Sequence, residues 1–465
     1  MKRRGILILG LAIFSLFGLG ALSGAHAAPF AYIPNSGSNT VSILDTATTP
    51  PGVKATLPVG TSPRGVASAV KTAETFTYVT NFGSDTVSVL RTYGDPLTTT
   101  PVFEKVRDIR VGRQPYGIAV NPAGTFAYVT NYEDNTVAKI DLGANAVTAT
   151  INVGSKPIGI VVTPDGAKLY VVNNSSGTVS VITTADDRVA ATVAVGSNPF
   201  GIAVNPSGAA VYVTNSGENS LSIIRTADDS VATKQDFRLG TPMGVAVNPA
   251  GTLAYLTNYG TSTLTVFDAV TETFNTANIA VTVNPLGVSS SLDGAFTYVV
   301  SNSAGTLSVI DNATNTERLP PVQVGSSPYA LGSFVARFGT TVPTVTATKP
   351  AGGAADVSLG TEIQVTFSDF MDAATITPAT FFVSGGVTGT VTYDNATKTA
   401  QFKPARNLEK NTAYTVTLTT AIRNTLGNAL AVYFLTKDCS RNKLHLYNDY
   451  MHTLPIEYCL PAPKF

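Results

Sequence analysis

The side chains that most often perform catalysis or bind transition metals gather at the far end of this 465-residue chain. The two cysteines are Cys439 and Cys459, and two of the three histidines are His445 and His452. Between residues 28 and 438 there is neither cysteine nor histidine. That stretch therefore supplies no thiol nucleophile, no imidazole base and no metal site with nitrogen or sulfur ligands. We expect no catalytic residue of these kinds, no bound metal and no cofactor.

The last segment, residues 437–465, differs in composition from everything before it. A disulfide between Cys439 and Cys459 is feasible in an oxidising compartment. A metal site that uses His445 and His452 is a second interpretation. A third is that this atypical tail is a disordered or misread extension, for example after a frameshift in the gene. The residues leave all three open.

A different set of side chains in the body of the chain has types suited to ligand binding. These cationic and aromatic residues interrupt an otherwise repeated pattern, and they are Arg64, Arg113, Tyr116, Tyr132, Lys156, Phe200, Tyr259 and Tyr329. Aromatic rings with a few cations can bind a glycan, a peptide or an anionic ligand. The structural alternative is that each is an ordinary surface residue. Which interpretation applies depends on where the repeats place these residues.

Two motifs alternate along the first two thirds of the chain. The first is Tyr-x-x-Asn, whose copies begin at Tyr32, Tyr78, Tyr128, Tyr170, Tyr212 and Tyr255, with a variant, Tyr-Val-Val-Ser, at Tyr298. The second is the link Val-Gly-x-x-Pro-x-Gly, found at residues 59–65, 111–117, 153–159 and 195–201, with variants at 239–244, 283–287 and 324–330. Runs of β-branched residues between turn residues predict four strands per repeat. Four strands in a repeat of 42 or 43 residues is the anatomy of a propeller blade.

Seven copies predict seven blades and a closed ring. The repeat array begins at Phe30, on what would be the second strand of a blade. The last link runs into residues 331–338 without another Tyr-x-x-Asn after it. A late strand should therefore complete the first blade and remove both open edges. The repeated Tyr, Asn, Gly and Pro are expected to be scaffold, with glycines such as Gly65 near the crowded axis. The link and the turn after Tyr-x-x-Asn should share one face, which places the eight candidate residues around the channel mouth.

These motifs, in this register, closely resemble the YVTN-type β-propeller repeat proteins of archaeal surface layers and bacterial exported proteins. Residues 340–436 resemble a bacterial Ig-like domain of the SbsA surface-layer type, on Phe367-Ser-Asp-Phe-Met-Asp372 and Phe402-Lys-Pro404 among other motifs. The two resemblances imply an all-β chain. Residues 28–339 would form a seven-bladed propeller, and residues 340–436 would form an Ig-like β-sandwich.

The first 27 residues are predicted to be a secretory signal. Lys2, Arg3 and Arg4 precede an apolar run, and Ala25-His-Ala27 forms a small-x-small cleavage site. Removal of the signal leaves 27 Lys and Arg against 30 Asp and Glu, a formal net charge of −3. We expect no transmembrane segment after that removal and no nucleic-acid partner, because no basic footprint is present.

Three classes of function are compatible with these features. We favour an exported, non-enzymatic binding or structural protein, at the cell surface or extracellular, that presents its propeller to a protein or glycan partner. The periplasm is the second choice of location. A propeller enzyme of lactonase or lyase type and a periplasmic redox-partner subunit are the alternatives. The sequence does not define the oligomeric state.

Overall fold

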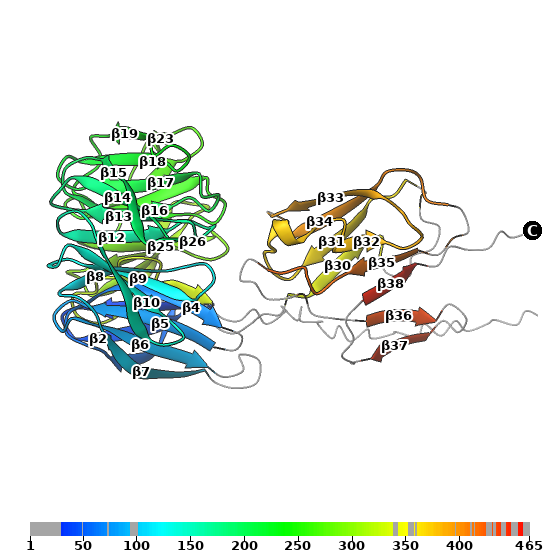
Figure 1. The fold of residues 1–465 in the computed structure, drawn as a ribbon, viewed down its shortest axis with the longest axis horizontal. Helices are drawn as coiled ribbons and strands as arrows, with labels where there is room; N and C mark the ends of the chain where they lie inside the picture. The colour runs from blue at the N-terminus through cyan, green and yellow to red at the C-terminus, as the bar shows by residue number, and fades with distance from the viewer. Residues whose placement is uncertain are drawn as a thin grey trace, which may run out of the picture.

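The protein is all-β: seven antiparallel sheets surround a common axis, and a smaller β-sandwich follows them (Figure 1). The computed structural model describes residues 29–458, apart from residues 49, 72–73, 94–100, 338–342, 352–357, 359, 396, 410–411, 413, 425–429, 431–433, 439–442, 448–453. For residues 434–438, 443–447 and 454–458 it describes the backbone alone. The predicted signal and the predicted Cys439–Cys459 disulfide lie outside the described residues.

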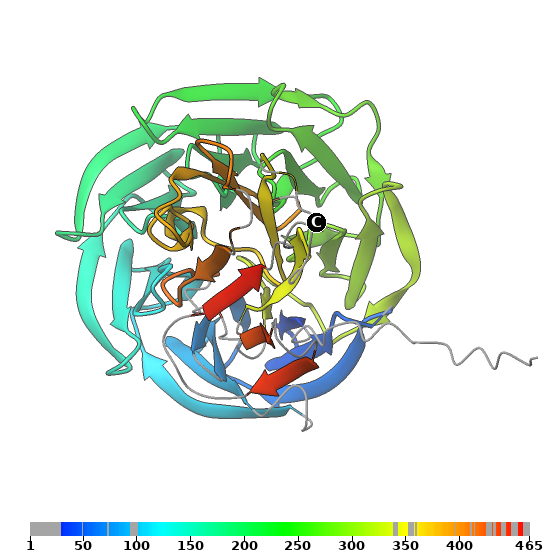
Figure 2. The same cartoon turned by 90° about the vertical axis from the view of Figure 1, so that its right-hand side faces the viewer.

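The strands of the seven sheets occupy four concentric positions, one strand for each position in six sheets, whereas the sheet that begins with β20 has two short strands in its outer position (Figure 2). The inner strands are β4 (Pro63–Lys71), β8 (Pro115–Val120), β12 (Pro157–Val162), β16 (Pro199–Val204), β20 (Pro242–Val247), β25 (Pro285–Ser290) and β29 (Val335–Arg337). The second strands are β5 (Glu74–Asn81), β9 (Phe126–Asn131), β13 (Lys168–Asn173), β17 (Ala210–Asn215), β21 (Leu253–Asn258), β26 (Phe296–Ser301) and β1 (Pro29–Asn35). The third strands are β6 (Thr86–Tyr93), β10 (Thr136–Asp141), β14 (Thr178–Thr183), β18 (Ser220–Arg225), β22 (Thr263–Asp268), β27 (Thr306–Asp311) and β2 (Thr40–Asp45). The outer strands are β7 (Val102–Arg110), β11 (Ala146–Asn152), β15 (Arg188–Ala194), β19 (Val231–Gln235), β23 (Thr273–Phe274) with β24 (Ile279–Ala280), β28 (Thr316–Gln323) and β3 (Gly52–Pro58).

The burial of each strand follows its composition and its place in the blade. Second and third strands are almost wholly buried, because both faces of a blade pack against neighbouring blades. All residues of β17 are buried, and all residues of β18 except Arg225. Outer strands alternate between exposed and half-buried residues, as in β15. All seven tyrosines of the Tyr-x-x-Asn motif are among the largest fully buried side chains. Their role as scaffold follows from that burial.

The threonine of the motif ties each blade to the next. Thr80 Oγ1 accepts a hydrogen bond from the backbone N–H of Gly65 at 2.8 Å and donates to the carbonyl of Tyr116, in the next blade, at 2.6 Å. Thr130 makes the same pair of bonds one blade further on, to Gly117 and Ile158. Neighbouring inner strands thus approach closely through their glycines, as expected.

The motif asparagine stabilises its own blade in a way the sequence did not suggest. An asparagine at the end of a strand can bond the backbone of its own turn. Asn81 Nδ2 instead donates to Thr86 Oγ1 at 3.0 Å and to Ser88 Oγ at 2.9 Å, both on the third strand. The amide therefore crosslinks two strands of one blade inside the core.

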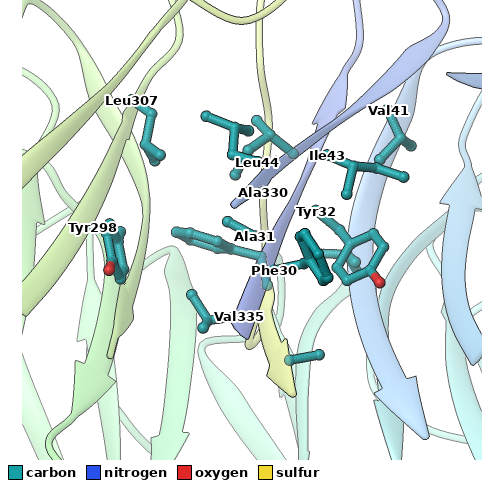
Figure 3. Close-up of a cluster of buried hydrophobic side chains, with 14 of the residues drawn as sticks. Phe30, Ala31, Tyr32, Val41, Ile43, Leu44, Tyr298, Leu307, Ala330 and Val335 are labelled. Atoms are coloured by element: carbon teal, nitrogen blue, oxygen red, sulfur yellow. The ribbon is translucent and has the colours of Figure 1, made fainter. Parts of the chain in front are cut away.

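The predicted closure of the ring is confirmed. Strand β1 pairs antiparallel with β29, with Phe30 opposite Ala336 and Ala31 opposite Val335, so the two ends of the repeat array share one sheet. Figure 3 shows the apolar side chains that pack at this junction, among them Phe30, Val335 and Tyr298 from the preceding blade. Pairing here removes the edges that an open array would expose.

The Ig-like sandwich follows the closing strand. One sheet has the order β30 (Val345–Lys349), β31 (Ile363–Phe367), β34 (Thr399–Pro404), β33 (Gly389–Asp394). The other contains β32 (Phe381–Val383), β35 (Tyr414–Leu418) and β38 (Leu454–Tyr458), and a 3₁₀ turn, η1 (Ala373–Thr375), precedes β32. Phe367, Phe381 and Phe402 are at the centre of its core. In the atypical tail, β36 (Phe434–Asp438) pairs with β37 (Lys443–Tyr447).

The chain leaves the propeller from its innermost position. Because β29 is the inner strand of its sheet, its last residues lie beside the channel, on the face opposite the links. Figure 2 shows the Ig-like sandwich in front of the centre of the ring. Among the described residues, none belongs to a helix with the length and hydropathy needed to span a membrane.

Candidate functional site

A ring of seven side chains, one per blade, surrounds the channel on the link face. Each follows a link proline, which begins the inner strand in six of the seven blades, so the repeat itself places them at one level. The ring members are Arg64, Tyr116, Ile158, Phe200, Met243, Leu286 and Tyr329. Six of the seven are apolar or aromatic. Arg64 is the one charged member.

Link geometry holds these residues in place. The residue before each link proline has a left-handed backbone, for example Gln114 at φ 54° and Lys156 at φ 54°. The N–H of Gln114 donates to Asp85 Oδ1 at 2.8 Å, and its carbonyl accepts from the N–H of Tyr132 at 3.1 Å. The link and the turn after Tyr-x-x-Asn are therefore hydrogen-bonded together, which confirms that they share a face.

Arg64 lies within a cluster of aromatic rings. Its guanidinium carbon is 3.6 Å from the ring centroid of Phe82, 4.4 Å from that of Tyr116 and 5.0 Å from that of Tyr329. Tyr132 adds a fourth ring, with its centroid 5.8 Å from that of Tyr116. Each such cation–π contact contributes about 0.5 to 2 kcal/mol, depending on desolvation. The rings hold the cation in one place without neutralising it.

The nearby carboxylates are paired with other cations. Asp134 accepts from Arg113 Nε at 2.6 Å, and Glu133 accepts from Lys156 Nζ at 2.6 Å. None of the ion pairs formed by the described residues includes Arg64, and its Nε is buried with no hydrogen-bond partner among them. Arg64 is thus a partly buried cation whose charge the described residues leave unpaired.

Two tyrosine hydroxyls complete the centre of the cluster. Tyr116 and Tyr329 are hydrogen-bonded through their hydroxyl oxygens. Burial raises the pKa of Tyr116, and the charge of Arg64 opposes that rise. Burial also raises the pKa of Tyr329 well above its usual range. Both hydroxyls therefore stay protonated at neutral pH. One donates to the other, so one O–H of the pair remains to donate to a ligand.

The eight residues chosen from the sequence divide into three groups. The structure brings together Arg64, Tyr116, Tyr132, Phe200 and Tyr329 in one cluster. Lys156 borders it, with Nζ 4.8 Å from the centroid of Tyr132, whereas Arg113 points into solvent beside Asp134. Tyr259 lies in the adjoining turn, where its N–H donates to Thr241 and its carbonyl accepts from Asn284.

Sequence reasoning missed two residues that pack in the same cluster. Ile158 and Leu331 are both buried against Tyr116 and Phe200. Ile158 has the same repeat position as Arg64, so alignment of the seven links contains the signal for it. No sequence signal marks Leu331, because it joins the cluster only when the ring of blades closes. Its N–H then donates to the carbonyl of Arg64 at 3.2 Å.

The described residues contain no group of three or more His, Cys, Asp or Glu side chains that could hold a metal ion. The chemistry that this cluster offers is therefore recognition by a cation, one free hydroxyl donor of the tyrosine pair and the faces of the half-buried rings. Glu133 and Asp134 add two ionised carboxylates at the rim. Their pKa values are lowered, that of Glu133 by its hydrogen bond from Lys156 and that of Asp134 by the backbone N–H of Arg113.

Comparison with known proteins supports the fold on both parts of the chain. Residues 27–192 match the family described as lactonase, 7-bladed beta-propeller, and residues 339–436 match the bacterial Ig-like domain. The fold is accordingly a seven-bladed β-propeller followed by an Ig-like β-sandwich, and the two matches show which families these parts resemble.

Solved structures resemble the propeller at low identity. A chain of hydrazine synthase from Kuenenia stuttgartiensis superposes with a TM-score of 0.53 at 24% identity, over 62% of this chain and 96% of that one. A putative 6-phosphogluconolactonase from Bacteroides fragilis superposes with a TM-score of 0.54 at 14% identity, over 68% of this chain and 99% of that one. At these identities the likeness shows the fold alone. No curated protein matches the chain.

Proposed function

We propose that this protein is a non-enzymatic binding protein whose link face captures an acidic glycan. The observation that carries the proposal is the unpaired charge of Arg64 among the rings of Phe82, Tyr116 and Tyr329. A partly buried cation without a counter-charge is unfavourable in the free protein. A carboxylate on the ligand removes that penalty and gains charge-assisted hydrogen bonds.

The surroundings of Arg64 suit a sugar acid. The hydroxyls of Tyr116 and Tyr329 are protonated at neutral pH, and the cluster adds flat apolar faces to the charged group. Arginine can bind a carboxylate through two parallel hydrogen bonds, which gives orientation as well as affinity. Lys156 and Arg113 lie at the rim, where they can attract further negative charge along a chain of sugars.

The test is calorimetric titration of the purified protein with oligogalacturonate and with its methyl ester, which lacks the negative charge. We expect binding of the acid and at least tenfold weaker binding of the ester. Arg64→Gln should weaken binding of the acid at least tenfold. Arg188→Gln is the matched control, because Arg188 is an 82% exposed arginine at the start of β15, away from the links.

Equal affinity for acid and ester, or equal loss in both arginine variants, would refute the role of Arg64. Melting temperatures of the two variants should stay close to the parent value. That comparison separates loss of the ligand contact from loss of the fold.

A second candidate function, lactone hydrolysis, is favoured by the family match over residues 27–192. In that case the ionised carboxylates Glu133 and Asp134 are the available general bases, since the tyrosine hydroxyls are protonated. Turnover of 6-phosphogluconolactone that Glu133→Gln abolishes would establish this candidate. A rate equal to the uncatalysed blank, with oligogalacturonate binding intact, is the outcome expected for a binding protein.

Export and display at the cell surface are part of the proposal. They rest on the predicted signal and on the Ig-like domain, a module that spaces or anchors the propeller. Protease shaving of intact cells, with a lysed control, tests this directly. We expect peptides from the links around Arg113 and Lys156 to be released from intact cells. Their release after lysis alone would place the protein inside the envelope.

A further inference from the structure

A cavity lies inside the ring of blades, separate from the cluster around Arg64 on the link face. It has a volume of about 580 Å³ and is lined by all seven blades. Representative lining residues are Ala119, Val161, Ala203, Val247, Ser289 and Val335. Pockets of 300 to 1,000 Å³ are the usual size for small-molecule sites. Nothing in the proposed glycan site accounts for this cavity.

The lining is apolar and carries no charge. Val and Ala side chains such as Ala119 and Val120 are only half-buried, because they face the channel. The polar members of the lining are serines and one asparagine, so no lining residue is ionisable. Water against this surface is displaced favourably by an apolar ligand, at about 25 cal/mol per Å² of apolar area removed from water.

The cavity is closed at one end. At the link face Tyr116, Ile158, Phe200 and Leu331 pack together as a buried cluster directly above the inner-strand residues that line the channel. The other end opens where β29 leaves the ring, and Phe370 and Asn395 of the Ig-like domain line it there. A blind channel cannot be threaded by a polypeptide, so its shape suits a short ligand that enters end-on.

We propose that the blind channel binds a neutral aliphatic molecule, such as a medium-chain alcohol. Three observations support it: an uncharged lining, half-buried aliphatic side chains, and one closed end. A carboxylate in this channel would find no cation among the lining residues, whereas an alcohol finds serine hydroxyls near the mouth. The occupant is thus distinguished from the acidic ligand proposed for the link face.

The experiment is a fluorescence titration of the full protein with N-phenyl-1-naphthylamine, followed by displacement with decanol and with decanoate. We expect saturable binding and displacement by decanol at least tenfold more effective than by decanoate. A double variant, Ala119→Leu with Ala203→Leu, fills the channel and should weaken probe binding at least tenfold. Ala203→Ser, which changes polarity with little change in size, should weaken it to a smaller extent.

Ala146→Leu is the matched control, because Ala146 is exposed on outer strand β11 of the blade that contains Ala119. It should leave probe affinity unchanged, and so should Arg64→Gln. Absence of saturable binding would overturn the proposal, as would equal affinity in the double variant and the parent. Loss of probe binding in Arg64→Gln would place the probe on the link face and also overturn it, while the glycan proposal is judged by oligogalacturonate alone.

Discussion

At the scale of single residues, the inner-strand glycines are fixed by contact rather than by turn geometry. A Cβ added to Gly201 would lie 2.1 Å from the carbonyl oxygen of Met243, in the next blade, and 3.0 Å from Thr214 Oγ1. The obstacle is backbone, which cannot rotate away as a side chain does. Neighbouring blades must therefore separate to admit even one methyl group.

We predict that Gly201→Ala lowers the free energy of unfolding by about 3 kcal/mol, the upper part of the usual range for overpacking. Gly52→Ala is the control, because the nearest atom to its added Cβ is Thr48 Oγ1 at 3.9 Å. It should be neutral or slightly stabilising, since alanine restricts the unfolded chain. Urea denaturation of both variants measures the difference. Similar midpoints for the two would show that the blades tolerate the methyl group.

Arg64 is the residue whose chemistry the scaffold does not use. Thr80 is hydrogen-bonded within the propeller, and the link glycines and the motif tyrosines are packed there. The Arg64 guanidinium has rings on several sides and no carboxylate. Because its repeat position holds apolar or aromatic residues in the other six blades, an arginine there is not needed for packing. That contrast is the reason we assign it to ligand recognition.

At the scale of elements, the closing strand β29 joins the two ends of the repeat array although it is only three residues long. Phe334, which immediately precedes it, compensates by burial: it is 0% exposed, and its carbonyl accepts from the N–H of Tyr32 at 2.8 Å. The side chain packs in the core that joins the first and last blades. Ring closure therefore depends on a side chain as much as on strand pairing.

Phe334→Ala is expected to lower the free energy of unfolding by about 4 kcal/mol, as large-to-small changes in cores do. Phe237→Ala removes the same atoms from a side chain that is 95% exposed, and should change stability by less than about 0.5 kcal/mol. Thermal and urea melts of the pair provide the measurement. If the two variants were equally stable, the core at the closure would not be what keeps the ring shut.

At the scale of the whole molecule, six of the seven buried motif tyrosines couple the stability of the propeller to alkaline pH, because burial raises their pKa values. Burial raises the pKa from 10.0 to about 12 in four of them, namely Tyr32, Tyr78, Tyr128 and Tyr298. Above pH 10 the unfolded chain loses these protons while the folded protein keeps them. The stabilisation is therefore complete below pH 10 and is lost as the pH rises through about 12.

The expected loss approaches about 1.4 kcal/mol per pH unit for each such tyrosine, so the protein should unfold steeply between pH 10 and 12. Circular dichroism and tyrosinate absorbance, followed on one sample through the titration, should change together. Full ionisation of the tyrosines with an unchanged circular dichroism spectrum would contradict the coupling.

The sequence by itself was sufficient for the architecture. Strand patterning between turn residues defines four strands per repeat, and seven repeats with complementary ends predict a closed ring. Both are consequences of local chemistry and of the need to pair strand edges, so neither requires knowledge of distant contacts. The shared face of the links and the Tyr-x-x-Asn turns also followed from strand alternation.

What the sequence could not decide was the outcome of contacts between distant segments. It offered eight candidates, but only packing around the axis brings Arg64 beside Tyr329 of the last link. The blind channel exists because Phe200, Tyr116 and Leu331 meet across the ring, from blades that are far apart in the chain. Local periodicity determines the strands. The unpaired charge of Arg64 and the blind channel arise only when the ring closes, because distant segments then come into contact.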